Sequence, residues 1–193
     1  MARWKIRNSP NCDLCGKVQS QIHVLNNCSA AVNEGRYKWR HDSVLKTLLS
    51  YLGSLNDFEV YADVEGYRSS AMFFNSSIPD IVLIKNNNLY AIELTICFET
   101  NFTKSRNYKI NRYKNLANDV IGNYIVKKLF LEISSLGFYT NDAKPFIKFC
   151  KKLKVNNVER MLKKCSEVAI RASFFLNIRK NKEWPQPSLL SFV

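Results

Sequence analysis

Residues 79–97 read PDIVLIKNNNLYAIELTIC, and this stretch decides the fold. Two apolar runs, at residues 81–84 and 89–97, flank a polar asparagine triplet that is typical of a tight turn. We therefore expect two β-strands joined as a hairpin. Asp80 would open the first strand and Glu93 would lie inside the second, so the two carboxylates can meet on one side of the sheet.

Helical and extended patterns alternate on both sides of this hairpin. Before it, the pair Asp42-Ser43 can cap a helix that ends at Gly53. The other expected elements are a strand at 58–64, a loop at 65–78, a basic helix at 104–118, a strand at 126–133 and helices at 142–153 and 157–180. This order predicts an α/β core with a mixed central sheet and helices on its faces.

The two acids of the hairpin are candidates for metal-dependent chemistry. Paired carboxylates offer the hard oxygen ligands that Mg²⁺ prefers, and the ion would activate water and offset charge on a phosphate. A lysine would complete such a site. The position two residues after Glu93 is Thr95, but Lys109 on the following helix can reach back to the sheet. The alternative is a pair of solvent-facing acids on adjacent strands without catalysis.

A second constellation, Cys12-x2-Cys15-x7-His23-x4-Cys28, has the spacing of a zinc knuckle. Three thiolates and one imidazole fill a tetrahedral shell, so the zinc would be structural, and it would supply the folding energy of so short a unit. The alternative is a chance cluster of thiols. The remaining cysteines lie among apolar residues, as buried thiols do: Cys97, Cys150 and Cys165.

The positive charge is concentrated at the two ends of the sequence. The chain has 193 residues and a net charge of +13, divided as +5 over residues 1–41, −1 over 42–143 and +10 over 144–182, with Glu183 supplying the remaining −1. Two basic segments of this kind are typical of proteins that bind a polyanion such as nucleic acid. The alternative is a solvated basic surface that aids solubility. No apolar run reaches the ~18–20 residues that span a bilayer, and we expect no secretory signal and no membrane partner.

Taken together, these motifs resemble the C-terminal region of non-LTR retrotransposon (LINE-type) reverse transcriptase proteins. That region carries a zinc knuckle and a restriction-like endonuclease of the PD-(D/E)XK superfamily. The resemblance runs over residues 12–180. It rests on the knuckle, the Arg40-His41 pair after it, Pro79-Asp80, Glu93, and Lys109-x-x-Arg112-Tyr113-x-x-Leu116.

The resemblance implies a division of the chain and a role for each motif. A knuckle with a basic lead-in would occupy residues 1–30, a restriction-endonuclease-like domain 36–182, and a tail 183–193. Asp80, Glu93 and Lys109 would be the catalytic residues, with Mg²⁺ on the two acids and Zn²⁺ on the knuckle. Nucleic-acid contacts are expected from a larger set: Arg40, His41, Lys104, Arg112, Tyr113, Lys151, Lys152, Lys163 and Lys164.

By this resemblance, the domain would nick double-stranded target DNA in the nucleus. The 3′-hydroxyl end would serve as the primer for target-primed reverse transcription. Its other partners would be the reverse transcriptase domain of the same polyprotein and the element's RNA.

The sequence departs from the family pattern in two respects: Ile78 stands where a basic residue is common before the Pro-Asp pair, and the reverse transcriptase that normally precedes this region is expected to be absent. In addition, Thr95 stands where the short form of the motif has its lysine. A rival function is therefore a nucleic-acid-binding module, or element remnant, without catalysis. A third, a zinc-stabilised protein-interaction domain, is disfavoured by the +13 charge.

Overall fold

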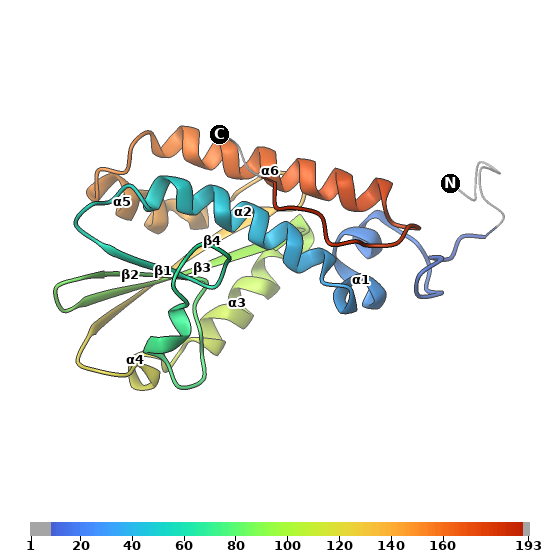
Figure 1. The fold of residues 1–193 in the computed structure, drawn as a ribbon. Helices are drawn as coiled ribbons and strands as arrows, with labels where there is room; N and C mark the ends of the chain where they lie inside the picture. Colours follow the sequence, from blue (N-terminus) through green and yellow to red (C-terminus); the bar gives the residue numbers. More distant parts are fainter. Residues whose placement is uncertain (1–8, 191–193) are drawn as a thin grey trace.

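In the computed structural model, which describes residues 9–190, a four-stranded sheet lies between two layers of helices (Figure 1). The helices and strands are α1 (Ser29–Asn33), α2 (Arg36–Leu52), β1 (Glu59–Ala62), β2 (Ile81–Lys85), β3 (Asn88–Cys97), α3 (Phe102–Arg112), α4 (Leu116–Asp119), β4 (Ile125–Ser134), α5 (Lys144–Lys152) and α6 (Val158–Ile178). Short helical turns occur at His23–Asn27, Ser70–Phe73, Glu99–Asn101 and Asn141–Ala143.

The sheet is mixed, with the strand order β1-β2-β3-β4. The first three strands are antiparallel, whereas β4 pairs parallel to β3 along its whole length. The hairpin expected from residues 79–97 is confirmed, with its turn at Asn86, which has a positive φ of 52°. The expected α/β class with a mixed sheet flanked by helices is also confirmed.

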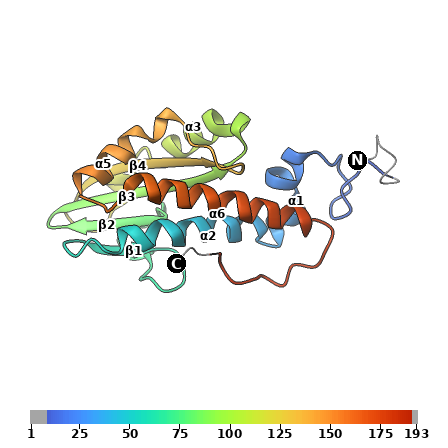
Figure 2. The same ribbon diagram turned by 90° about the horizontal axis from the view of Figure 1, so that it is seen from above.

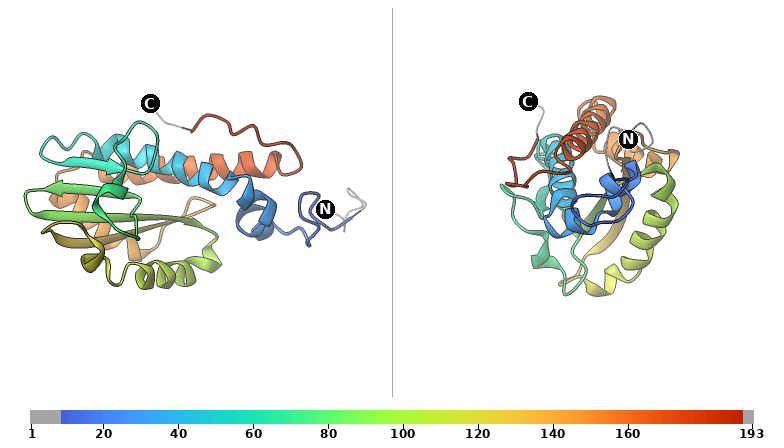
Figure 3. Two further views of the ribbon diagram at one scale, coloured as in Figure 1. Left: turned by 60° about the horizontal axis from the view of Figure 1, so that its bottom comes forward. Right: turned by 90° about the vertical axis from the view of Figure 1, so that its right-hand side faces the viewer.

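Alternation along β3 divides the core between the two faces of the sheet. Ile92 and Leu94 face the layer formed by α2, α5 and α6, and Leu89 and Ala91 face α3 and α4. Figure 3 (right) looks along the sheet from the knuckle end, with α3 on one side and α2 with α6 on the other. Glu93 shares the face of Ala91, because it lies two residues further along the strand.

Helix α2 begins at Arg36, six residues before the expected cap at Asp42-Ser43, so that prediction was wrong. Gly35 turns the chain with a φ of 70°, and the Ser43 hydroxyl donates within the helix to Trp39 O instead of capping it. The earlier start is stabilised by distant partners. Arg36 donates to the carbonyls of Arg179 and Lys182 at the end of α6, both at 2.8 Å.

The helix expected at 104–118 is divided into α3 and α4. Tyr113 leaves the helical conformation, and the Lys128 ammonium on β4 donates to the carbonyls of Tyr113 and Lys114, both at 3.1 Å. These carbonyls would otherwise lack partners at a helix end. A side chain from a strand thus sets where α3 ends.

The segment after α6 packs back onto α2. Trp184 lies against Trp39, with ring centroids 5.3 Å apart, and the Trp39 indole donates to Pro187 O at 2.8 Å. The Leu190 amide donates to the Ser43 hydroxyl. The expected tail at 183–193 is therefore packed as far as residue 190, and residues 191–193 lie outside the described part, as do residues 1–8 of the expected lead-in. No helix of residues 9–190 is long and apolar enough to cross a bilayer.

Gly137, in the turn after β4, is expected to tolerate alanine poorly. Its φ is +88°, and an added Cβ would lie 2.5 Å from Ile170 Cδ1 and 3.2 Å from Ser166 O. Gly137→Ala should lower the free energy of unfolding by about 2–4 kcal/mol, from strain and overpacking together. Gly66 is a matched control, because its φ is +93° and an added Cβ meets nothing within 4 Å.

Urea unfolding of both variants checks this prediction. Gly66→Ala should lose only about 1–2 kcal/mol, from backbone strain alone. Equal losses in the two variants would contradict the proposed clash with Ile170.

Candidate functional site

Asp80 and Glu93 meet where β2 begins beside the middle of β3. The Asp80 amide donates to Glu93 Oε1 at 3.1 Å, and the Leu94 amide donates to Asp80 Oδ2 at 2.8 Å. The Glu93 side chain is 3% exposed and that of Asp80 20%. The Asp80 Oδ1 atom accepts no hydrogen bond from residues 9–190, which leaves one carboxylate oxygen open to a ligand.

The polypeptide that leads into Asp80 is fixed by its neighbours. Pro79 has no amide hydrogen to pair, so the ladder of β2 starts at Ile81. The Ser70 hydroxyl donates to Pro79 O at 2.7 Å, and the Tyr113 hydroxyl donates to Ile78 O at 3.0 Å. These bonds hold the acid at the point where β2 and β3 meet.

Lys109 reaches the acid pair from α3. Its ammonium donates to Glu93 Oε2, and its side chain is 19% exposed. The lysine expected from the following helix therefore lies at the acids, whereas Thr95, two residues beyond Glu93, is half-buried on the same face of β3.

His41 reaches the acid pair from α2 on the opposite layer. Its Nε2 lies 3.3 Å from both Asp80 Oδ2 and Leu94 O, and its Nδ1 lies 3.0 Å from Asp42 Oδ1. All three neighbours are acceptors, so both ring nitrogens donate and the ring is a cation. Burial lowers the pKa of His41, but the charges of Asp80 and Asp42 prevail and raise it to about 9. The sequence left two roles open for the Arg40-His41 pair, a DNA contact or packing at the start of a helix, and the contacts of His41 here are to Asp80, Asp42 and the Leu94 carbonyl.

The two carboxyl groups differ in acidity. Burial raises the pKa of Asp80, but the positive charges of His41 and Lys109 outweigh it, so the pKa is lowered overall. Burial and the neighbouring charge of Asp80 raise the pKa of Glu93 against the opposing effect of Lys109. Such divergence is common where two acids share a functional site.

A buried ion pair, missed in the sequence, anchors α3 to the sheet. Arg106 Nη1 donates to both oxygens of Glu132 on β4 at 2.9 Å, and Glu132 is 3% exposed. Arg106 lies three residues before Lys109, on nearly the same face of α3. The pair thus holds α3 where Lys109 can reach Glu93. The available signal was Glu132 between the apolar residues Leu131 and Ile133, because a buried charge needs a partner.

The four knuckle residues form a cluster that could bind zinc. Their ligand atoms all lie within 4.8 Å of one another. Cys12 Sγ lies 3.9 Å from Cys28 Sγ, and Cys15 Sγ lies 3.3 Å from His23 Nε2. Zinc–ligand bonds of ~2.0–2.3 Å in a tetrahedron place ligand atoms roughly 3.5–3.8 Å apart, so the donor set and its spacing fit the ion.

Local turns and one tyrosine position the cluster. Cys12 and Cys15 lie in a turn that Gly16 closes with a φ of +73°, and the Ser20 hydroxyl accepts from the His23 amide. Tyr37 of α2 ties the unit to the rest of the protein. Its hydroxyl accepts from the Cys28 amide at 3.0 Å and lies near the carbonyls at the start of the His23–Asn27 turn.

The remaining candidate contacts for nucleic acid are spread over the molecule. Arg40 and Tyr113 are both buried, at 1% and 2% exposure, and the Tyr113 hydroxyl donates to Ile78 O, which gives that side chain a positioning role. The exposed or half-buried candidates are Lys104 and Arg112 on α3, Lys151 and Lys152 on α5, and Lys163 and Lys164 on α6. Lys164 pairs with Glu167 at 3.3 Å.

The basic residues of α5 lie far from the knuckle. Lys151 and Lys152 end α5 at one end of the molecule, and the knuckle occupies the other end (Figures 1 and 2). The structure therefore places Lys104, Lys109 and Arg112 together on α3, where Lys109 contacts Glu93, and the α5 lysines at the end of the molecule away from the knuckle.

The chain matches no model of a known protein family and no curated protein.

Proposed function

We propose that this chain is a Mg²⁺-dependent DNA endonuclease domain of the non-LTR retrotransposon type, with a restriction-endonuclease-like core and a zinc knuckle. The observation that carries the proposal is the convergence of Asp80, Glu93 and Lys109, from β2, β3 and α3, at one point of the sheet. A pair of largely buried acids beside a lysine, of which Asp80 is the more exposed, suits hydrolysis of a phosphodiester bond.

In this mechanism Asp80 and Glu93 would hold the metal. The ion, when bound, would act as a Lewis acid that activates water and offsets charge on the phosphate. The Lys109 ammonium would neutralise charge that develops on the phosphate oxygens. The His41 cation and the Leu94 amide both contact Asp80 Oδ2 and would thus fix the orientation of this carboxylate.

The product would be a nick with a 3′-hydroxyl end. In an intact element that end would prime reverse transcription in the nucleus by a polymerase domain of the same polyprotein. Double-stranded DNA would be the substrate, and the element's RNA a second partner.

A binding module without catalysis is the second candidate, favoured by the hydrogen bonds of Glu93. Both of its oxygens already accept from protein donors, the Asp80 amide and Lys109. A metal ion would have to bind at the remaining lone pairs or displace Lys109. Thr95 in place of a lysine supports the same candidate.

The proposal is tested by incubating the protein with supercoiled plasmid in the presence of Mg²⁺, of Ca²⁺ or of EDTA. We expect relaxation with Mg²⁺ alone, and nicked ends that a polymerase can extend without further treatment, as a 3′-hydroxyl requires. Salt-sensitive binding without any relaxation, on plasmid and on a random-sequence duplex library, would favour the binding module.

Lys109→Ala is expected to lower the cleavage rate by ~10²–10³-fold, because one group that stabilises transition-state charge is lost. Adding Thr95→Lys to that variant should restore part of the rate, since residue 95 shares the face of Glu93 on β3. Lys114→Ala, an exposed lysine beyond α3, is the control and should cleave as the wild type does. The initial rate of plasmid nicking is measured for the wild type and for the three variants. Wild-type rates for Lys109→Ala would show that Lys109 only packs against Glu93.

A further inference from the structure

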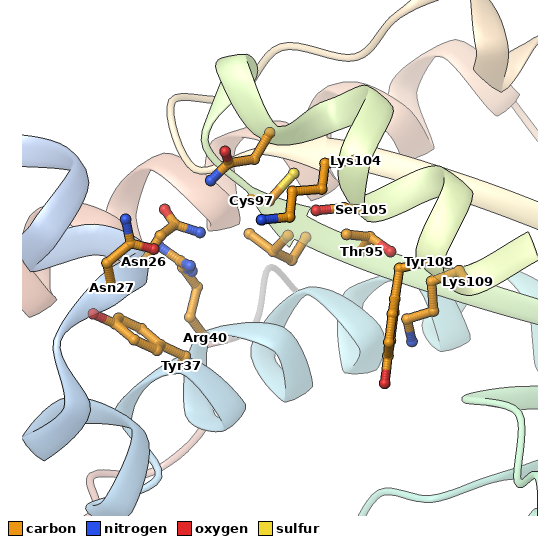
Figure 4. A pocket seen from close by; sticks show the side chains of 12 residues that line it. Asn26, Asn27, Tyr37, Arg40, Thr95, Cys97, Lys104, Ser105, Tyr108 and Lys109 are labelled. Atoms are coloured by element: carbon orange, nitrogen blue, oxygen red, sulfur yellow. The ribbon is translucent and has the colours of Figure 1, made fainter. Parts of the chain in front are cut away.

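A cavity of about 520 Å³ lies between the knuckle and the nuclease-like core (Figure 4). The knuckle contributes Asn26 and Asn27, α2 contributes Tyr37 and Arg40, and α3 contributes residues from Asn101 to Lys109. The stretch 95–97 of β3 lies along the same cavity. Thr95 and Lys109 thus belong both to this cavity and to the surroundings of the acid pair.

The cavity is positively charged, and part of that charge is desolvated. No acidic residue lines the cavity among the described residues, whereas three basic residues do: Arg40, Lys104 and Lys109. Arg40 is 1% exposed, and burial lowers its pKa to about 10. Its guanidinium lies over the Tyr37 ring, 5.5 Å from the centroid, and no carboxylate of residues 9–190 pairs with it. A buried cation without an anionic partner is rare in proteins and costs free energy.

Two polar atoms at the cavity lack partners. Arg40 Nη1 donates to the Ser173 hydroxyl at 3.1 Å, but Arg40 Nε, which is buried, has no hydrogen-bond partner among residues 9–190. The buried Asn26 Oδ1 atom also has none, and a half-turn of the amide would present its NH₂ group instead. In Figure 4 the side chains of Arg40 and Lys104 approach the same space from α2 and α3.

We propose that this cavity binds a backbone phosphate of the DNA strand, held by Arg40 and Lys104, next to the phosphate that is cleaved. The inference rests on the proposed function, because it places a second phosphate of the same substrate. An arginine fork and a lysine are the side chains that phosphate recognition uses most. Residues 95–97 lie roughly 7–13 Å beyond Glu93 along β3. A DNA strand carries one phosphate for about every 3.4 Å of helix axis, so the bound phosphate lies within a few nucleotides of the cleaved bond.

The knuckle would then contribute to DNA binding at this cavity. Asn26 and Asn27 form one wall of the cavity, directly before the ligand Cys28. Zinc would therefore hold that wall at the right distance from Lys104. The knuckle would thus act on the strand near the cleavage site, besides any contact with DNA further away.

The test is an NMR titration that observes the Arg40 Nε–H group, assigned by its absence in Arg40→Lys. The probe is a 16-base-pair duplex with Ca²⁺ in place of Mg²⁺, and separate arms use inorganic phosphate, a mononucleotide and an octaglutamate peptide. We expect the duplex to shift the Arg40 Nε–H signal at micromolar concentration, and phosphate or mononucleotide to shift it only at far higher concentration. No shift is expected with the peptide.

Lys104→Gln measures how much this lysine contributes to duplex binding. Because Lys104 is exposed, its loss should not affect folding. It should weaken duplex binding roughly fivefold, lower the salt slope by about one and reduce the Arg40 shift. Lys148→Gln, an exposed lysine on α5, is the charge-matched control and should leave the Arg40 shift unchanged.

Three results would overturn the proposal. These are duplex binding without an Arg40 shift, equal effects of the Lys104 and Lys148 variants on that shift, and a shift caused by the peptide or by free mononucleotide as readily as by the duplex. An Arg40 shift with the duplex in a protein that never cleaves DNA would instead support the phosphate site and count against the nuclease.

Discussion

Glu93→Gln is expected to lower the rate of Mg²⁺-dependent DNA cleavage by ~10³-fold or more. A carboxylate that holds the metal contributes several kcal/mol of transition-state stabilisation, and each 1.36 kcal/mol is a factor of ten in rate. Glutamine keeps the shape and can still accept from the Asp80 amide, but it lacks the charge that binds the ion. DNA binding in Ca²⁺ should be equal or tighter, because one negative charge leaves the site.

The control for this variant is Asp57→Asn, which removes one exposed acid that pairs with Lys85 on the surface. It should cleave as the wild type does. Thermal unfolding of both variants separates a lost activity from a lost fold, since Lys109 loses its ion-pair partner in Glu93→Gln. Cleavage by Glu93→Gln at even a tenth of the wild-type rate would remove Glu93 from the metal site.

Removal of zinc is expected to unfold the knuckle. The described part of this unit buries little apolar surface of its own, with Cys12, Cys28 and Ala31 as its small core. Structural zinc contributes about 10–16 kcal/mol in comparable peptides, so the metal is the main source of stability here. We expect one zinc per chain by mass spectrometry, and its loss on chelation should release the turn at Asn26 and Asn27.

Cys28→Ser should reproduce the effect of the chelator, with less than a tenth of the zinc retained. Cys165→Ala is the matched control, because Cys165 is a buried thiol of α6 outside the cluster, and it should keep a full equivalent of zinc. Stoichiometric zinc in Cys28→Ser would contradict the assignment of these four residues as the zinc ligands. Limited proteolysis after chelation should cut within residues 11–28 first and leave the sheet intact.

Local patterns sufficed to predict the hairpin and the meeting of its two acids. The period-two alternation and the asparagine turn determine the register that places Asp80 opposite Glu93. The Cys/His spacing likewise predicted which four side chains gather. In both cases the interacting residues are within about twenty positions of one another, so the sequence itself carries the geometry.

Contacts between distant residues were beyond the reach of such patterns. Helix α2 starts at Arg36 because its guanidinium is bonded to carbonyls more than 140 residues away. The contact of His41 with Asp80 joins α2 to the sheet across 39 residues. Whether Arg40 Nε finds a partner among residues 9–190 depends on which elements surround it, and no local pattern predicts that.

Folding during synthesis is affected by the contacts between α2 and the segment after α6. In these contacts Arg36, Trp39 and Ser43 pack against residues 179–190, which the ribosome adds much later. A ribosome adds roughly 5–20 residues per second, so these α2 side chains wait several seconds or more for their partners to be synthesised. Until then Trp39 lacks the ring of Trp184, and the guanidinium of Arg36 lacks its carbonyl acceptors. Closure of so long a loop is slow as well as late. The nascent chain therefore exposes the first turns of α2, beside the cavity and the acid pair, until the segment after α6 leaves the exit tunnel.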